Sequence, residues 1–154
     1  MTMVGPRGDA AVEAASGHDA QRAVVVRVGA AAAYLAPLRA VAGDLATRAD
    51  FDLDTVADLR LAVDEAAAEL VGLATSGALL TGTFLAGEQG MEVTLSVPSA
   101  PERVLPDNTF GWRVLTTLVD EVRALHDQQD GMPVTGILLR KRRGEQAEVG
   151  AAGR

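Results

Sequence analysis

Apolar residues follow a recognisable period along the first half of this chain. A β-branched run at residues 23–28 has the length of a strand, and Gly29 follows it. Apolar residues then recur three and four positions apart, with Pro37 near the start, where a helix tolerates proline. The members of this repeat are Tyr34, Leu35, Leu38, Val41, Ala42 and Leu45. The pattern predicts a strand followed by a helix over Ala30–Thr47.

A second helical repeat predicts a helix over Asp54–Leu73. Thr55 followed three residues later by Asp58 is a capping-box pattern, which satisfies backbone N–H groups at a helix start. Asp52 and Asp54 also suit the positive end of a helix dipole. The predicted core face consists of Val56, Leu59, Val63, Ala66, Leu70 and Leu73. This helix is therefore expected to bury one apolar stripe.

The middle of the chain changes to a period of two. Ala78–Leu85 has the composition of a strand, and the glycine-rich residues 87–90 predict a hairpin turn. Apolar and polar residues alternate through Met91–Val97, which is typical of a half-buried strand with one polar face. Pro98–Asn108 contains three prolines and is therefore predicted to be a loop.

The pattern after this loop predicts a third helix over Thr109–Leu125, with His126 at its end. Its apolar stripe consists of Trp112, Leu115, Leu118, Val119, Val122 and Leu125. A polar loop at Asp127–Pro133 and a final strand at Val134–Leu139 complete the pattern. Hairpin-connected strands with helices gathered between them predict an α+β fold. We expect a two-layer α/β sandwich, in which a mainly antiparallel sheet of roughly four or five strands carries its helices on one face.

Composition narrows the class of protein. The 154 residues suffice for one domain, predicted at 22–143, between ends at 1–21 and 144–154 that are predicted to be disordered. The absence of cysteine excludes disulfides, thiolate metal sites and a cysteine nucleophile, and suits a reducing cytoplasm. No apolar run approaches the roughly 20 residues that span a membrane.

The charge balance argues against nucleic acid as a partner. The formal net charge is −7, and a phosphate backbone repels an acidic protein. The basic cluster Arg140–Arg143 is interpreted as a solvated end of a strand, with nucleic-acid binding as the less favoured alternative.

Two acidic residues of the second predicted helix raise a chemical question. Glu65 and Glu69 are four residues apart and share one helix face with Leu61 and Asp58. Like charges at this spacing destabilise a helix by roughly 0.2–0.5 kcal/mol. Water, a cation or a partner must therefore accept them. From spacing alone, a solvated surface pair is the plainer interpretation.

Three segments together resemble the Bergerat-fold (histidine-kinase-like) ATPases, in particular the bacterial anti-sigma factor and serine kinase family. Asp58–Val71 is similar to the family's Leu-x-Leu-Ala-Val-x-Glu-Ala-x-x-Asn helix. Gly111–Val122 is similar to the helix after the nucleotide lid, and Gly136–Lys141 to the closing strand. The similarity covers roughly Val24–Arg142 and extends to actinobacterial anti-sigma proteins of the RsbW type, which control a stress or sporulation sigma factor.

The resemblance implies a site for ATP and Mg²⁺. In active members the glutamate of this helix orients or deprotonates a water or hydroxyl group, and the asparagine four residues later binds the magnesium ion. Glu65 matches the glutamate and is the candidate catalytic residue. Glu69 stands at the asparagine position, where a carboxylate can also ligate magnesium. Gly111 is what remains of the lid glycines, so Glu69 and Gly111 are the candidate nucleotide contacts.

Other positions depart from the family pattern. After the strand that corresponds to Met91–Val97, active members carry an aspartate for the adenine amino group and then glycines. This chain has Pro98-Ser99-Ala100-Pro101 there. Proline lacks a backbone donor, and the side chains of serine and alanine restrict the backbone. We therefore expect ATP binding to be weak or absent, and catalysis stays open.

The resemblance supports a binding protein as the first hypothesis. It implies an anti-sigma factor that sequesters an alternative sigma factor, is released by an anti-anti-sigma factor and forms a homodimer. The family's sigma-facing surface points to Arg27, Tyr34 and Arg39. The alternatives are a core position for Tyr34 and a merely solvated strand position for Arg27. An acidic surface would meet a basic sigma surface. Its predicted members are Asp50, Asp52, Asp54, Asp58, Asp64, Glu65 and Glu69.

Two other functions remain open at the level of sequence. One is an active protein-serine kinase or ATPase of the same family, which would phosphorylate the antagonist through Glu65, with Glu69 in place of asparagine. The other is an unrelated small α+β domain. Direct measurement of nucleotide binding separates the first of these from the binding protein.

Overall fold

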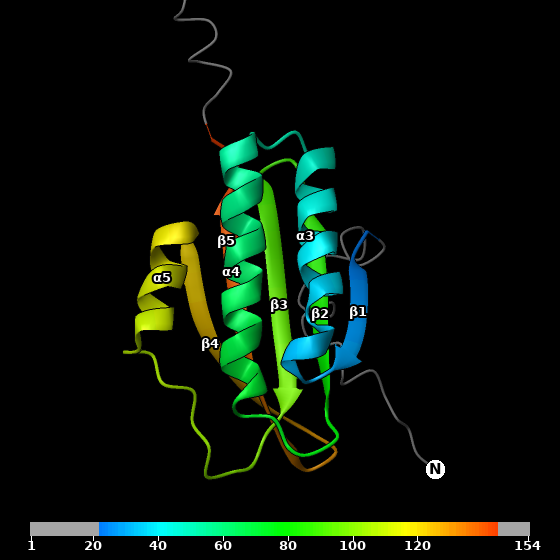
Figure 1. The fold of residues 1–154 in the computed structure, drawn as a ribbon, viewed down its shortest axis with the longest axis vertical. Coiled ribbons are helices and arrows are strands. Elements are labelled where there is room, and N and C mark those ends of the chain that lie inside the picture. The colour runs from blue at the N-terminus through cyan, green and yellow to red at the C-terminus, as the bar shows by residue number, and fades with distance from the viewer. Residues whose placement is uncertain (1–21, 145–154) are drawn as a thin grey trace, which may run out of the picture.

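The computed structural model describes residues 22–144, so the ends predicted to be disordered, 1–21 and 144–154, lie outside the described residues except for Gly144. Five strands form one antiparallel sheet with the order β1-β2-β3-β5-β4. The strands are β1 (Val24–Gly29), β2 (Leu79–Ala86), β3 (Gly90–Pro98), β4 (Glu121–Gln129) and β5 (Met132–Arg142). The last described strand, β5, therefore lies between β3 and β4 (Figure 1).

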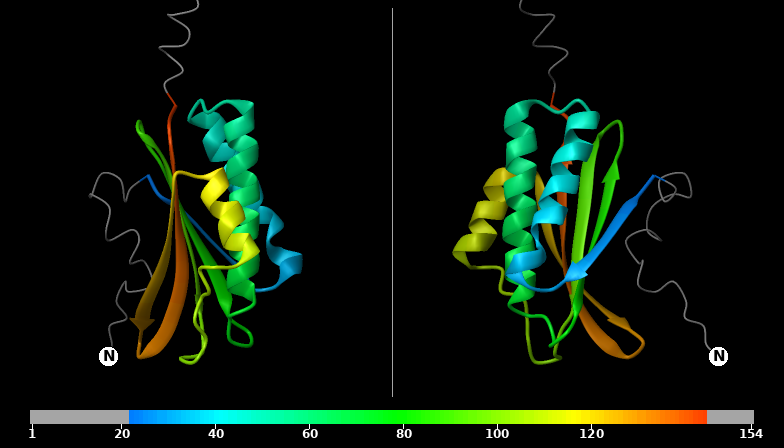
Figure 2. Two further views of the ribbon diagram at one scale, coloured as in Figure 1. Left: turned by 90° about the vertical axis from the view of Figure 1, so that its left-hand side faces the viewer. Right: turned by 45° about the vertical axis from the view of Figure 1, so that its right-hand side comes forward.

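Helices cover one face of this sheet. They are the 3-10 helix η2 (Ala32–Tyr34) and the α-helices α3 (Ala36–Arg48), α4 (Leu53–Val71) and α5 (Phe110–Leu118). Figures 1 and 2 show α4 between α3 and α5, and no described helix on the opposite face of the sheet. The predicted two-layer α+β architecture is confirmed, with five strands in the sheet.

The hydrophobic core lies between the sheet and the helices. Phe84 on β2 and Val93 on β3 are cross-strand neighbours, and Leu139 continues this row on β5; all three are fully buried. The apolar positions of β3 confirm the predicted alternation, because Met91, Val93, Leu95 and Val97 are all buried. A shift of register by one residue would turn these side chains away from the helices, so the alternation fixes the pairing.

The helix starts differ in detail from the sequence prediction. The helix predicted over Ala30–Thr47 begins as η2 and continues as α3, with Pro37 in the first turn of α3. α4 is capped by Asp52, whose carboxylate accepts a hydrogen bond from the Thr55 backbone N–H at 2.7 Å. The capping box predicted at Thr55 is therefore wrong. Asp52 has an extended backbone just outside the helix, where its side chain reaches the free N–H groups.

The helix predicted over Thr109–Leu125 is wrong in its second half. α5 ends at Leu118, and β4 begins at Glu121. The break lies at Val119, whose φ of −131° and ψ of 167° are extended. The apolar residues of this segment fit the helical period as well as the strand period, and pairing with β5 decides in favour of the strand.

The polar loop predicted at Asp127–Pro133 is replaced by a tight hairpin. β4 and β5 are joined at Asp130 and Gly131, whose φ angles of 53° and 79° are both positive. Positive φ at both central residues is the type I′ geometry that an Asp-Gly pair favours. The sequence therefore contained a signal for this hairpin. The residues assigned to the helix or its end that lie in β4 are Val122, Leu125 and His126.

Candidate functional site

Two acidic side chains of α4 lie against the start of α5. Glu65 and Glu69 are both half-buried, one helical turn apart, and both carboxylate groups lie beside Gly111. Leu61, one turn before Glu65, is 52% exposed. The structure thus brings Glu65, Glu69 and Gly111 together, and no β-carbon fits between Gly111 and the two carboxylate groups.

Thr109 connects this cluster to the backbone of α5. It is the N-cap residue of α5, and its Oγ1 accepts a hydrogen bond from the Trp112 backbone N–H at 3.1 Å. The same hydroxyl group donates to Oε1 of Glu69 at 3.2 Å. Sequence reasoning did not select Thr109 as a site residue, although a threonine just before an apolar repeat is a recognised helix-start signal. A hydrogen-bonded chain therefore runs from the α5 backbone through Thr109 to Glu69.

Gly111 permits the close approach of α5 to the two carboxylate groups. A β-carbon built on Gly111 would overlap Oε1 of Glu69 and would lie 2.8 Å from Oε1 of Glu65. Gly111 itself is buried. Negative charge is favourable beside the first turn of a helix, where free N–H groups and the helix dipole give a positive potential. The start of α5 is thus matched with negative charge from within the chain.

The segment after β3 carries hydroxyl groups where the family has a carboxylate. Ser99 is 1% exposed, and its Oγ lies 2.8 Å from Oγ1 of Thr135 on β5. The Ser99 backbone N–H donates to the carbonyl of Pro133, and the Thr75 N–H donates to the carbonyl of Pro98, both at 3.0 Å. The Ser99 side chain and both peptide groups are therefore used inside the fold. Sequence reasoning placed this segment in a loop and did not foresee the buried Ser99–Thr135 pair.

These contacts do not fit the ATP and Mg²⁺ that the resemblance implies. A phosphate group needs room and exposed backbone N–H groups, whereas Glu65 and Glu69 fill the space beside Gly111. The Ser99–Thr135 pair offers adenine no carboxylate. The catalytic role of Glu65 and the nucleotide and metal roles of Glu69 and Gly111 stay predictions.

The three residues predicted to face a sigma factor lie on different elements. Tyr34 ends η2 and is 57% exposed, so the alternative of a core position is wrong. Arg39 on α3 donates from Nη1 to Oδ1 of Asp64 on α4 at 2.9 Å. Arg27 is an exposed residue of β1 and has an interaction partner of its own. Tyr34 and Arg39 thus belong to the helix layer, whereas Arg27 belongs to a strand at the edge of the sheet.

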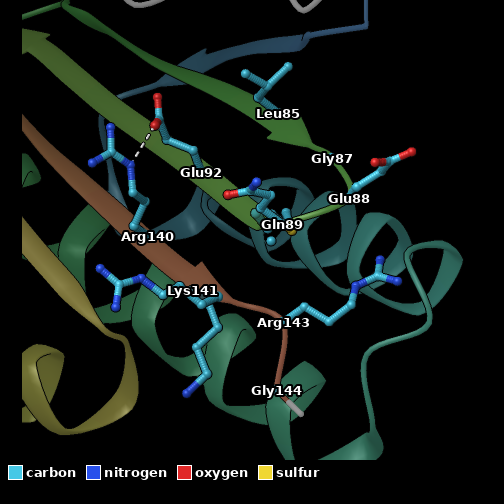
Figure 3. Close-up of a pocket in the computed structure, with 12 residues that line it drawn as sticks. Leu85, Gly87, Glu88, Gln89, Glu92, Arg140, Lys141, Arg143 and Gly144 are labelled. Carbon is cyan, nitrogen blue, oxygen red and sulfur yellow. Dashed lines mark hydrogen bonds and ion pairs between the residues drawn. The ribbon is translucent and has the colours of Figure 1, made fainter. Parts of the chain in front are cut away.

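The basic run at the end of β5 lines a hollow of ≈ 690 Å³ beside the β2–β3 hairpin (Figure 3). Arg140 donates to Glu92 on β3 and to Glu121 on β4, each at 2.8 Å. Burial alone would raise the pKa of Glu121, but hydrogen bonds from Arg140 and Arg123 outweigh it and hold this pKa below its ordinary value. The hydrogen bond to Glu92 raises the pKa of Arg140. Arg140 is therefore an ion-paired link across three strands.

Two other side chains of the basic run, those of Lys141 and Arg143, also contact other elements of the structure. Lys141 Nζ donates to the carbonyl of Leu118 at the end of α5, at 3.3 Å. Arg143 donates to the carbonyl of Ala49, and its guanidinium carbon lies 5.7 Å from the ring centroid of Phe51. The interpretation of this run as a solvated terminus is right for part of it, since Arg142 and Arg143 are exposed. Lys141 and Arg143 also satisfy carbonyl groups at the ends of helices, where a cation is favourable.

Comparison with known proteins identifies two relatives from Mycobacterium tuberculosis. Both are described as anti-sigma-F factor RsbW, one from strain CDC 1551 / Oshkosh and one from strain ATCC 25618 / H37Rv. Each is 39% identical to this chain over 125 residues, which cover 79% of this chain and 74% of the relative. No protein-family model matches the chain. Within residues 22–144, no helix is both long and apolar enough to cross a membrane.

Proposed function

The chain belongs to the family of the RsbW-type anti-sigma factors, and from this premise we propose that it binds and sequesters an alternative sigma factor in the cytoplasm. The observation that carries the proposal is the 39% identity to anti-sigma-F factors over 79% of the chain. Residues 22–143 are proposed as the binding domain. Sequestration needs a complementary surface and no bond-breaking chemistry, so it is compatible with a site that is filled by its own side chains.

We assign the sigma-facing surface to the outer side of η2, α3 and the start of α4. Tyr34 presents an exposed aromatic ring there, and Arg39 lies five positions further along the chain. Tyrosine and arginine are enriched among the side chains that dominate protein interfaces. Arg27 on β1 is a third candidate.

Acidic residues at the α3–α4 corner support a basic partner. Asp50 and Asp54 are exposed there. Asp64 is occupied by Arg39, and Glu65 and Glu69 lie against α5. The exposed negative charge of this surface is therefore concentrated at the α3–α4 corner rather than spread along α4. Such charge would raise the rate of association with a basic partner more than the affinity.

We propose that an anti-anti-sigma factor releases the sigma factor, and that the protein acts as a homodimer. The kinase alternative has less support, because the residues beside Gly111 and Ser99 do not fit ATP and Mg²⁺. ATP binding is accordingly expected to be weak or absent.

The test is capture of a candidate sigma factor by the full chain, with and without magnesium-ATP, together with inhibition of sigma-dependent transcription. We expect capture in both conditions. Glu65→Ala should capture the sigma factor and block transcription as well as the wild type. If Glu65→Ala remains folded by circular dichroism but loses inhibition, the kinase reading replaces the binding one.

Two variants distinguish loss of a contact with the sigma factor from loss of an ion pair within the protein. Arg39→Ala and Asp64→Ala each break the same ion pair, but only Arg39→Ala removes a proposed contact. We expect Arg39→Ala and Tyr34→Ala to weaken binding, and Asp64→Ala to bind like the wild type. Equal losses for Arg39→Ala and Asp64→Ala would show that this pair only stabilises the helix layer.

A further inference from the structure

We infer that Glu69, with Glu65 beside it, is an internal anion that latches α5 onto α4 and thereby excludes a nucleotide phosphate from the position beside Gly111. The inference deepens the proposed function and rests on it for family membership, since the family resemblance is what implies ATP at this position. Glu69 is thus a specificity-determining residue that acts against nucleotides, because its carboxylate takes the position that a ligand's phosphate would need.

The first argument is the hydrogen-bonded chain. Thr109 is held in one orientation because its Oγ1 accepts from the Trp112 N–H at 3.1 Å and donates to Glu69 at 3.2 Å. The single hydroxyl proton is thus directed at Glu69. A threonine that only capped α5 would leave this proton to solvent. The cap of α5 and the carboxylate of α4 form one unit.

The second argument is the space at Gly111. A β-carbon on Gly111 would overlap Oε1 of Glu69 and would lie 2.8 Å from Oε1 of Glu65. A phosphate group is larger than a methyl group, so it cannot enter while both carboxylates remain. It would also meet two negative charges at close range, and like charges repel strongly where water is partly excluded.

The third argument is the absence of a competing side-chain cation. Among residues 22–144, the salt bridges join other acids, and neither Glu65 nor Glu69 takes part in one. The hydrogen bond that joins Glu69 to α5 comes from the hydroxyl group of the cap residue Thr109, beside the positive end of the helix. Displacing Glu69 from this position would leave both groups without their partner.

The test uses Trp112, the only tryptophan of the chain, which lies on α5 and is half-buried. We expect Glu69→Ala and Thr109→Val to increase acrylamide quenching of Trp112. In both variants, hydrogen-exchange protection of the α5 amides should fall about tenfold, the factor that corresponds to 1.4 kcal/mol. Protection of the α3 amides should stay unchanged. Glu88→Ala is the matched control, since it removes one exposed acid in the β2–β3 turn.

Nucleotide exclusion is tested on the same signal. Magnesium-ATP at millimolar concentration should leave Trp112 emission of the wild-type protein unchanged. Glu69→Asn, which removes the charge and restores the family residue, should give a saturable change with magnesium triphosphate, a probe that needs no adenine contact. A saturable response of the wild-type protein, no response of the folded Glu69→Asn variant, or unchanged α5 protection in Glu69→Ala would each overturn the inference. None of these readouts uses a sigma factor, so failure of the latch and failure of the proposed function are distinguishable.

Discussion

α4 packs against α3 on one side and against α5 on the other. These two contacts, called the α3 joint and the α5 joint, allow the helices to approach closely in different ways. At the α3 joint, Gly43 lies under the side chain of Arg60, and Arg39 pairs with Asp64 at 2.9 Å. At the α5 joint, Gly111 lies under two carboxylate groups. The first joint neutralises an acid with a side-chain base. The second places its acids beside the positive end of a helix. The difference shows that a glycine can simply make room for a side chain at one helix contact and form part of a charged site at another.

The largest expected effect comes from removing apolar side chains, which measures how much core packing stabilises each joint. Leu38 on α3 and Leu115 on α5 are both fully buried. Leu38→Ala and Leu115→Ala should each lower the free energy of unfolding by about 2–5 kcal/mol, the usual cost of a large-to-small change in a core. Urea denaturation followed by circular dichroism measures both. A cost for Leu115→Ala far below that of Leu38→Ala would mean that the carboxylates, rather than the core, carry the α5 joint.

The glycines themselves give the next largest contrast. Gly111→Ala should lower the free energy of unfolding by about 1–2 kcal/mol, because the added methyl group displaces Glu69 and overpacks the joint. Gly43→Ala should be neutral or stabilise by up to about 1 kcal/mol. The exposed Arg60 side chain can move aside there, and alanine is the better helix former. Equal effects in thermal denaturation would remove the distinction between the joints.

The polar contacts at each joint can be compared by double-mutant cycles. The Arg39 and Asp64 side chains are 39% and 36% exposed, so their coupling free energy should lie at about 0.2–1 kcal/mol. The Thr109–Glu69 coupling should reach about 1 kcal/mol, since it involves a charged acceptor in a half-buried position. A larger value for Arg39–Asp64 would reverse the proposed order of the two joints.

The smallest expected effect concerns pH and lies away from both joints. The folded-state pKa of Glu121 is below its ordinary value of 4.5, through Arg140 and Arg123 acting against burial. Its carboxylate therefore adds stability that is complete above pH 4.5 and is lost as the pH falls through the lower, folded-state pKa. Glu121→Gln should be less stable than the wild type at neutral pH, and the gap should narrow in acid. A gap that is constant with pH in urea titrations would contradict this.

Periodicity sufficed where an element buries a single face. The predicted stripe of α4 matches buried residues except for Leu73, which is half-buried and lies beyond the helix, and the apolar positions of β3 are all buried. The nearest neighbours along the chain define which face is apolar. β4 was missed for the opposite reason. Its residues Val122 and Leu125 also fit a helix, and only the partner β5, reached through the Asp130–Gly131 turn, decides for a strand.

The sequence predicted which acidic residues of the candidate site share a helix face, but not what they contact. Spacing put Glu65 and Glu69 on one face of a helix, but nothing local indicates what that face meets. Glu69 and Thr109 are 40 residues apart in the sequence, and their contact depends on where the loop after β3 delivers α5. The roles of Lys141 and Arg143 were missed for the same reason, since their acceptors are carbonyl groups of distant helix ends.

The position of β5 has a consequence for how the protein is made. β5 is synthesised after every other described element, yet it lies between β3 and β4. While residues 132–142 are still missing, a nascent chain has β3 and β4 as two separate unpaired edges, the kind of surface that invites aggregation. The end of β5 also holds the ends of α3 and α5 through Arg143 and Lys141. Completion of this one strand therefore closes both layers, and the surface proposed to capture a sigma factor is finished only after β5 has been synthesised.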